Sequence, residues 1–218
     1  MVIVVATLLS LAATLLQPAQ ARNLEIEKKR NMLESINVGA TRENTEELYE
    51  KYISEGFVVN SDGNLVEDVD AFTVVVKNEQ KKPLERQYLP VFRAEPDNGE
   101  KVIIIPVEGK GLWGPIYGYV SLKSDMNTVY GTNFDHKGET PGLGAEINTT
   151  EFESQFLGKK LYDEAVFTSV QVVKGGAREN DPHGVDAISG GTITSKGLQD
   201  MIYDCLIKYN SYFLKNRI

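Results

Sequence analysis

The chain has few residues of the kinds that bind soft metals. Its 218 residues include one cysteine, Cys205, and only two histidines, His136 and His183. A single cysteine cannot form a disulfide within the chain, and two histidines without paired spacing make a poor metal site. We therefore expect no zinc or iron–sulfur cluster bound by this chain alone.

Runs of positive charge are also missing. There are 23 basic and 31 acidic residues, with a formal net charge of -8 and no tract of Lys and Arg. Such a chain lacks the electrostatic footprint needed to hold phosphate backbones, so we expect no nucleic-acid partner. Apolar residues at 41% and charged residues at 25% are typical of a folded domain.

The first 16 residues, in contrast, are apolar and carry no charge. A membrane-spanning helix needs about 20 such residues, and a signal peptide needs a basic start that is absent, although Ala19–Ala21 resembles a cleavage site. A buried helix is the third reading. We expect a membrane anchor over residues 1–17, shortened at its start. The basic residues of 22–30, taken alone, favour a cytoplasmic location for the rest of the chain.

Beyond the anchor, the sequence predicts an α+β fold in three further parts. Residues 18–56 should form a charged stalk helix ending near Gly39 and a packing helix over Glu46–Glu55, and residues 57–100 accessory strands and an irregular region. Residues 101–218 should form the main domain, an antiparallel sheet packed with helices. Its strands are expected at 101–109, 116–122, 128–135 and 165–176. Thr150 and Glu153 resemble a capping box.

The segment "DAISGGTITS", Asp186–Ser195, precedes the last predicted helix and has more hydroxyls than one helix cap requires. Unpaired N–H groups and the helix dipole make such a place suitable for a phosphate. Gly190 and Gly191 allow close approach, Ser189 and Thr194 could donate hydrogen bonds, and Thr192 has no evident structural role. A capped loop with spare hydroxyls and a phosphate site both stay open; a Walker loop is excluded.

Two glycine-rich loops could complete a site. "ETPGLG" presents Leu143 on a tight turn, and "GKGLWG" presents Trp113 as a local plug or a ligand platform. Lys174 is a candidate for balancing negative charge. His136, Glu139 and His183 are expected to be solvated loop residues.

A hydrolase triad of Ser189, His183 and Asp186 lacks the G-x-S-x-G elbow. We therefore do not expect a serine hydrolase.

These motifs resemble a known family. "DAISGGT" is similar to the flavinylation motif of the NqrC family, whose members are subunits of sodium-translocating NADH:quinone oxidoreductases. "ETPGLG", "GLWG" and the apolar segment followed by "KKR" are also similar to segments of this family. The resemblance implies FMN attached by a phosphoester to Thr192, with Asp186 and Ser189 in leading positions. Gly191 stands where the family usually has alanine. The implied cofactor-binding residues are Ser189, Gly190, Gly191, Thr194, Leu143, Trp113, Glu139, Thr140, Gly144 and Lys174.

The resemblance also implies a biological setting. It places a single-pass subunit in the bacterial inner membrane, with the FMN domain on the periplasmic side, a flavin transferase for maturation, and other subunits as partners. The subunit would relay electrons towards the next flavin and ubiquinone and would not be catalytic alone. We follow this orientation over the basic-residue count. A homologous subunit of an Rnf-type complex, a periplasmic phospholigand-binding module and a structural stalk are the alternatives.

Overall fold

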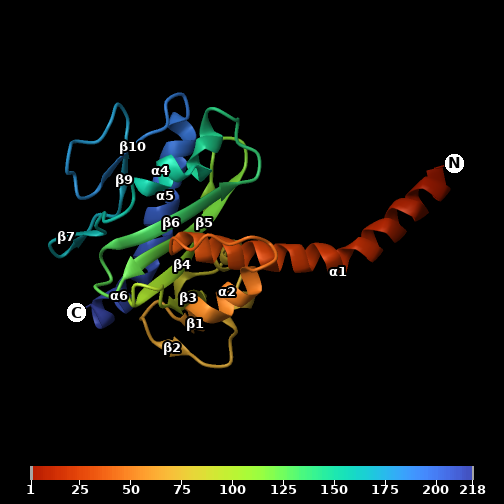
Figure 1. The fold of residues 1–218 in the computed structure, drawn as a ribbon, viewed down its shortest axis with the longest axis horizontal. Helices are drawn as coiled ribbons and strands as arrows, with labels where there is room; N and C mark the ends of the chain where they lie inside the picture. The colour runs from red at the N-terminus through yellow and green to blue at the C-terminus, as the bar shows by residue number, and fades with distance from the viewer. Residues whose placement is uncertain (1, 218) are drawn as a thin grey trace.

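The computed structural model describes residues 2–217 and begins with one long helix, α1 (Val2–Ser35). Its apolar half reaches a mean hydropathy of 2.0 over 18 residues, none of it buried, so α1 is long and apolar enough to span a membrane. The lack of burial argues against a core helix. The charged half joins the folded domain, as Figure 1 shows.

The remaining elements alternate short helices with strands. In chain order they are α2 (Thr45–Tyr52), β1 (Ile53–Val59), β2 (Leu65–Val66), η1 (Ala71–Thr73), α3 (Val76–Glu79), η2 (Leu84–Arg86), β3 (Leu89–Ala94), β4 (Val102–Lys110), β5 (Pro115–Lys123), β6 (Val129–His136), η3 (Gly144–Asn148), α4 (Thr150–Ser154), β7 (Tyr162–Asp163), β8 (Val166–Phe167), β9 (Gln171–Val173), β10 (Gly184–Asp186), α5 (Thr192–Leu206), η4 (Ile207–Tyr209) and α6 (Asn210–Asn216). The α+β fold class is confirmed.

Six strands form one antiparallel sheet in the order β2-β1-β3-β4-β5-β6. The longest pairing joins β4 and β5 from Val102↔Lys123 to Lys110↔Pro115, so these strands form a hairpin whose tip is residues 111–114. Strands β1 and β3 were expected to be accessory, but they lie in the same sheet as β4. The large sheet therefore includes strands from both sides of residue 100.

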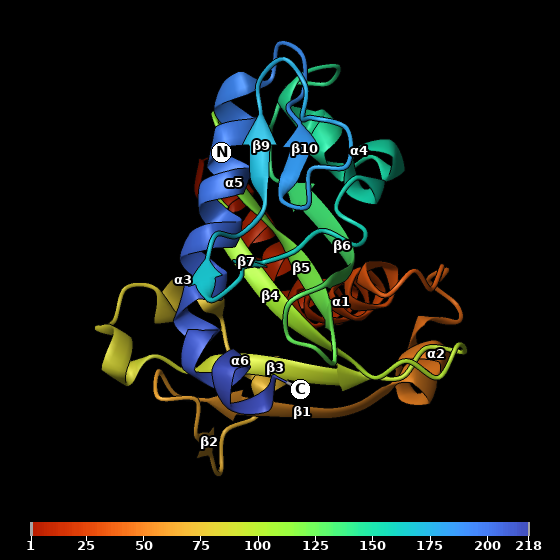
Figure 2. The same ribbon diagram turned by 90° about the vertical axis from the view of Figure 1, so that its left-hand side faces the viewer.

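The sheet is covered on both faces. Along β4, Ile103 and Ile105 belong to the core packed by α5, whereas Val102 and Ile104 belong to the core packed by α1. A strand turns alternate side chains to opposite faces, so this apolar run supplies both cores at once. Figures 1 and 2 show α1 and α5 on opposite sides of the sheet.

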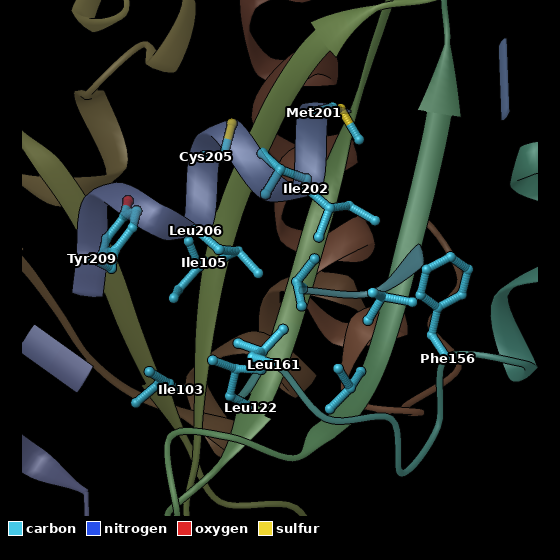
Figure 3. Packing of buried hydrophobic residues seen from close by; sticks show 14 of the residues in the cluster. Ile103, Ile105, Leu122, Phe156, Leu161, Met201, Ile202, Cys205, Leu206 and Tyr209 are labelled. Carbon is cyan, nitrogen blue, oxygen red and sulfur yellow. The ribbon is translucent and has the colours of Figure 1, made fainter. Parts of the chain in front are cut away.

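Helix α5 lies very close to β4 because glycines replace side chains at the contact. A Cβ on Gly109 would lie 2.6 Å from the Met201 Cβ, and one on Gly197 would lie 2.3 Å from the Lys110 carbonyl oxygen. Further along α5, Ile202 and Leu206 enter the core in Figure 3. The helix start is thereby held over the tip of the β4–β5 hairpin.

Several local predictions were wrong. The segment 165–176 does not join the large sheet; β8 pairs with β7, and β9 pairs with β10 in parallel. Gly56 lies inside β1, because the packing helix ends at Tyr52, and the stalk helix ends at Ser35, before Gly39. Strands β7 to β10 are too short for their partners to be read from the sequence. At the start of β1, pairing within the sheet outweighs the local preference for a helix.

Candidate functional site at the start of helix α5

Three loops meet at the first turn of α5. They are the β4–β5 hairpin tip (111–114), the segment after β6 (137–143) and the segment before α5 (187–191), and a buried carboxylate, Glu139, joins two of them to the helix. The site is thus assembled from positions distant in the sequence.

Glu139 is only 5% exposed and accepts hydrogen bonds from several donors. The Thr194 hydroxyl donates to its Oε2 at 2.6 Å, and the backbone N–H groups of Trp113 and Gly114 donate to its Oε1 at 2.8 and 3.3 Å. Burial alone would raise the pKa of Glu139, but these donors outweigh it and hold the pKa below its usual value. The expectation of a solvated loop residue was wrong, because the loop folds inward over the hairpin.

Glycines make room for this carboxylate. A Cβ at Gly111 would lie 2.5 Å from the Glu139 Oε1, and a Cβ at Gly144 would lie 2.6 Å from Oε2 and 2.4 Å from the Thr194 hydroxyl. Any larger residue at either position would displace Glu139. Gly144 therefore contributes through its small size, and Gly111 has an equivalent role that the sequence did not indicate.

The segment before α5 is fixed by its own hydrogen bonds. The Ser195 hydroxyl accepts from the Ile188 N–H at 3.1 Å, and the Gly191 N–H donates to the Ile188 carbonyl at 3.0 Å. Gly190 has a φ of 74°, and a Cβ there would lie 2.5 Å from a Leu143 methyl. The backbone of Gly190 thus packs directly on Leu143.

Thr192 is the first residue of α5 and is exposed, and two of the elements that meet at this helix start carry exposed apolar side chains. The Ser195 N–H bonds to the Gly191 carbonyl, whereas the N–H groups of the first helical residues have no partner within the helix. Trp113 is 68% exposed and Ile193 is 60% exposed. This combination suits a ligand with a phosphate at one end and a flat apolar group at the other.

Two helices start differently from a helix with a simple side-chain cap, and the cap predicted at Thr150 was wrong. Helix α5 begins at Thr192 and has no side-chain cap, because its N-cap residue is Gly191; the hydroxyls of Thr194 and Ser195, inside the helix, bond to Glu139 and Ile188. In α4, Thr149 rather than Thr150 accepts from the Phe152 N–H.

The remaining predicted residues lie around the site with less direct roles. The Thr140 carbonyl shapes the turn by accepting from the N–H groups of Leu143 and Ala145 at 3.1 Å each. Ser189 is exposed, and the Asp186 carboxylate accepts from the Ala177 N–H at 2.7 Å. Lys174 is exposed one residue beyond Val173, which pairs with Asp186. Lys174 thus lies at the end of β9, next to β10, which leads to the segment before α5.

Both histidines have local structural roles. His136 Nδ1 accepts from the Glu139 N–H at 3.2 Å, and His183 Nδ1 lies 2.8 Å from the Lys160 carbonyl. Across residues 2–217 no three His, Cys, Asp or Glu side chains are arranged to hold a metal ion.

Comparison with known proteins agrees with this geometry. Residues 111–207, which include all three loops and α5, match the FMN-binding domain family. The NqrC subunit of the Na(+)-translocating NADH-quinone reductase of Vibrio parahaemolyticus is 34% identical over 217 residues, covering 90% of this chain and 83% of the relative. The corresponding Pseudomonas aeruginosa protein is 31% identical over 214 residues, covering 88% and 82%.

Two crystal structures have the same fold. The corresponding reductase subunit from Parabacteroides distasonis is 43% identical, with a TM-score of 0.83 over 91% of this chain and 96% of that one. NqrC of Shewanella oneidensis is 29% identical, with a TM-score of 0.74 over 88% and 96%. The fold and the site thus define an FMN-binding domain joined to a helix able to span a membrane. The chain belongs to the NqrC family of Na(+)-translocating NADH-quinone reductase subunits.

Proposed function

We propose that the chain is the FMN-carrying subunit of a sodium-translocating NADH:quinone oxidoreductase, with FMN attached to Thr192 by a phosphoester. The observation that carries this proposal is the division of hydroxyls at the start of α5. The hydroxyls of Thr194 and Ser195 are buried and hydrogen-bonded within the protein. Thr192 stands exposed at the helix N-terminus, and among residues 2–217 its hydroxyl forms no hydrogen bond, so it is available for attachment to a phosphate.

The residues present fit FMN. Gly190 and Gly191 let the segment before α5 pack closely on Leu143 and Ile188, and the first N–H groups of α5 would be donors for a phosphate at Thr192. Trp113, Leu143 and Ile193 supply exposed apolar surface for a flat ring. Ser189 would donate a hydrogen bond to the phosphate, and Lys174 would balance the negative charge of the bound group. Glu139 would fix Trp113 and Thr194 in place.

Attachment forms a bond between the Thr192 oxygen and the phosphorus of FMN. The bond that breaks is the phosphoanhydride that joins this phosphorus to the nucleoside monophosphate half of a flavin dinucleotide; that half leaves as the free monophosphate, and the hydroxyl proton passes to a base of the flavin transferase or to water. When bound, FMN supplies the redox chemistry that relays electrons towards the next flavin and ubiquinone. The protein's own part is to hold the phosphate at the helix start and to keep the apolar walls rigid. Helix α1 would anchor the chain in the bacterial inner membrane with residues 101–218 on the periplasmic side.

The test is co-expression with the transferase, followed by denaturing electrophoresis and intact-mass measurement. The band should fluoresce and carry the mass of one FMN adduct, and Thr192→Val should abolish both. Thr150→Val is the matched control, since Thr150 is also the first residue of a helix. Fluorescence that survives Thr192→Val would contradict the proposal. A phosphorylated ligand retained without the transferase would favour a noncovalent binding module instead.

A further inference from the structure

A groove of about 590 Å³ lies on the α1 side of the sheet, on the face opposite to α5. It runs between the charged half of α1, the segment 71–76 and strands β4 and β5. None of the residues assigned to the flavin site lines it. The groove therefore needs an explanation of its own.

The floor and one wall of the groove are apolar. Met32, Phe92 and Tyr119 form a buried floor, and Val75 stands 47% exposed on one wall. Apolar side chains held open in this way are stabilised when another apolar group covers them, by about 25 cal/mol per Å² of surface removed from water. A volume of this size accommodates several large side chains of a partner.

Two carboxylates without ion-pair partners face the groove. Glu27 lies on α1 and Glu108 on β4, and within residues 2–217 neither forms a salt bridge, whereas nearby Glu25 is paired with Lys29 at 2.8 Å. Lys28 also lines the groove, where its ammonium donates to the Phe72 carbonyl at 3.0 Å and lies 5.0 Å from that ring, so three carboxylates of the lining, those of Glu25, Glu27 and Glu108, face one ammonium. The groove thus has a negative rim around an apolar floor.

The groove also begins close to the membrane. Its first lining residues, Ala21 and Leu24, come shortly after the apolar run that ends at Leu16. At 1.5 Å per residue, Leu24 lies about 12 Å beyond Leu16 along the helix axis. That distance corresponds to the headgroup region and the water layer next to it. An occupant can therefore reach the groove directly from a membrane-embedded neighbour.

We propose that this groove is the docking site for a membrane-proximal segment of another subunit, which inserts apolar side chains and pairs Lys or Arg with Glu27 and Glu108. The proposal rests on the proposed function, because it requires that the chain assemble with other membrane subunits. The negative charge of the groove favours a basic protein segment over a phospholipid as its occupant. The anionic phosphate of a phospholipid would meet two unpaired carboxylates, whereas a basic protein segment complements them.

The experiment places a photo-crosslinking amino acid at position 75 of the full chain, expressed with the other subunits and the transferase in its native membrane. Irradiation should join the chain to another subunit of the complex, at an apolar peptide next to Lys or Arg, as read by mass spectrometry. Glu27→Lys combined with Glu108→Lys should lower the yield about tenfold. Glu27→Gln combined with Glu108→Gln should give an intermediate yield with no change of charge sign.

Glu151→Lys is the matched control, since Glu151 is exposed on α4. Flavin fluorescence of each band is read in parallel. Unchanged fluorescence with lost crosslinking isolates the groove, whereas loss of fluorescence from the parent chain would count against the proposed function alone. Crosslinks only to lipid or to a second copy of the chain, no crosslink at all, or a yield insensitive to both charge variants would overturn the docking proposal.

Discussion

The hydroxyl of Thr194 on α5 donates a 2.6 Å hydrogen bond to the carboxylate of Glu139, which lies just after β6. The same carboxylate accepts from the backbone at the tip of the β4–β5 hairpin. One buried side chain therefore connects the helix start to two loops, and hydrogen-bond donors surround its charge. Such charge-assisted hydrogen bonds are stronger than neutral ones.

Glu139→Gln should loosen this connection. A glutamine keeps the size of the side chain, but its NH₂ group cannot accept a hydrogen bond, so donors to one oxygen lose their partner. We expect a loss of about 1.5–3 kcal/mol in the free energy of unfolding, measured by denaturation of the full chain in detergent. Glu151→Gln, on the exposed surface of α4, should change stability by less than about 0.5 kcal/mol. Equal effects of the two variants would contradict the role assigned to Glu139.

Gly197→Ala should move α5 away from β4. The added methyl would lie 2.3 Å from the Lys110 carbonyl oxygen, a backbone atom that cannot rotate away. We expect a destabilisation of about 1–3 kcal/mol, seen as a lower melting temperature. Gly39→Ala is the control, because a methyl there would have no other atom within 4 Å among the described residues. A tolerated Gly197→Ala would show that the helix contact is looser than these distances require.

Gly190 and Gly191 should respond differently to alanine. At Gly190 the φ of 74° and the 2.5 Å approach to Leu143 both disfavour a side chain, by about 1–2 kcal/mol for the backbone alone. Gly191 has a negative φ of -99°, and a methyl there would lie 2.9 Å from the Ile188 side chain, which must shift slightly. We expect Gly190→Ala to reduce both stability and flavin attachment, and Gly191→Ala to retain attachment. Fluorescence per mole of protein measures the difference; the reverse order would contradict it.

Glu153 should make stability depend on pH. Burial raises its pKa to about 7, with the charges of Glu34 and Asp135 adding to the effect and the Phe134 N–H opposing it. The folded protein then binds a proton that the unfolded chain has lost, so stability should fall as pH rises from about 4.5 to 7. Glu153→Gln should flatten the dependence in this window, measured by melting temperature against pH. A wild-type profile that rises across the window would be inconsistent with the assignment.

Some of these features could be predicted from the sequence and others could not. The apolar helix, the β4–β6 meander and the apolar stripe of α5 each leave a periodic pattern, and they occur as expected. The motif around Thr192 pointed to the family. The membership of β1 and β3 in the large sheet depends on pairing between distant segments, which local patterns do not report.

The role of Glu139 shows the same limit at the scale of one side chain. In sequence it stands in a polar loop, and only the folded hairpin brings two N–H groups and one hydroxyl around it. Gly111 and Gly144 would have been informative as a pair, since each leaves space for the same carboxylate. Only the folded structure shows that both glycines make room for Glu139.

Helix α1 has a mechanical consequence. It runs without a break from the apolar segment to Ser35, and its last turns, with Met32 and Leu33, are fixed beneath the sheet. At 1.5 Å per residue its 34 residues measure about 51 Å along the helix axis; Pro18 lies inside the helix, which bends along its length in Figure 1. If the apolar half is held in a membrane, as proposed, a change in the bend of α1 would swing the sheet, and the start of α5 with it, through an arc above the bilayer. In that arrangement the orientation of this one helix would set how far the site stands from any neighbour in the membrane.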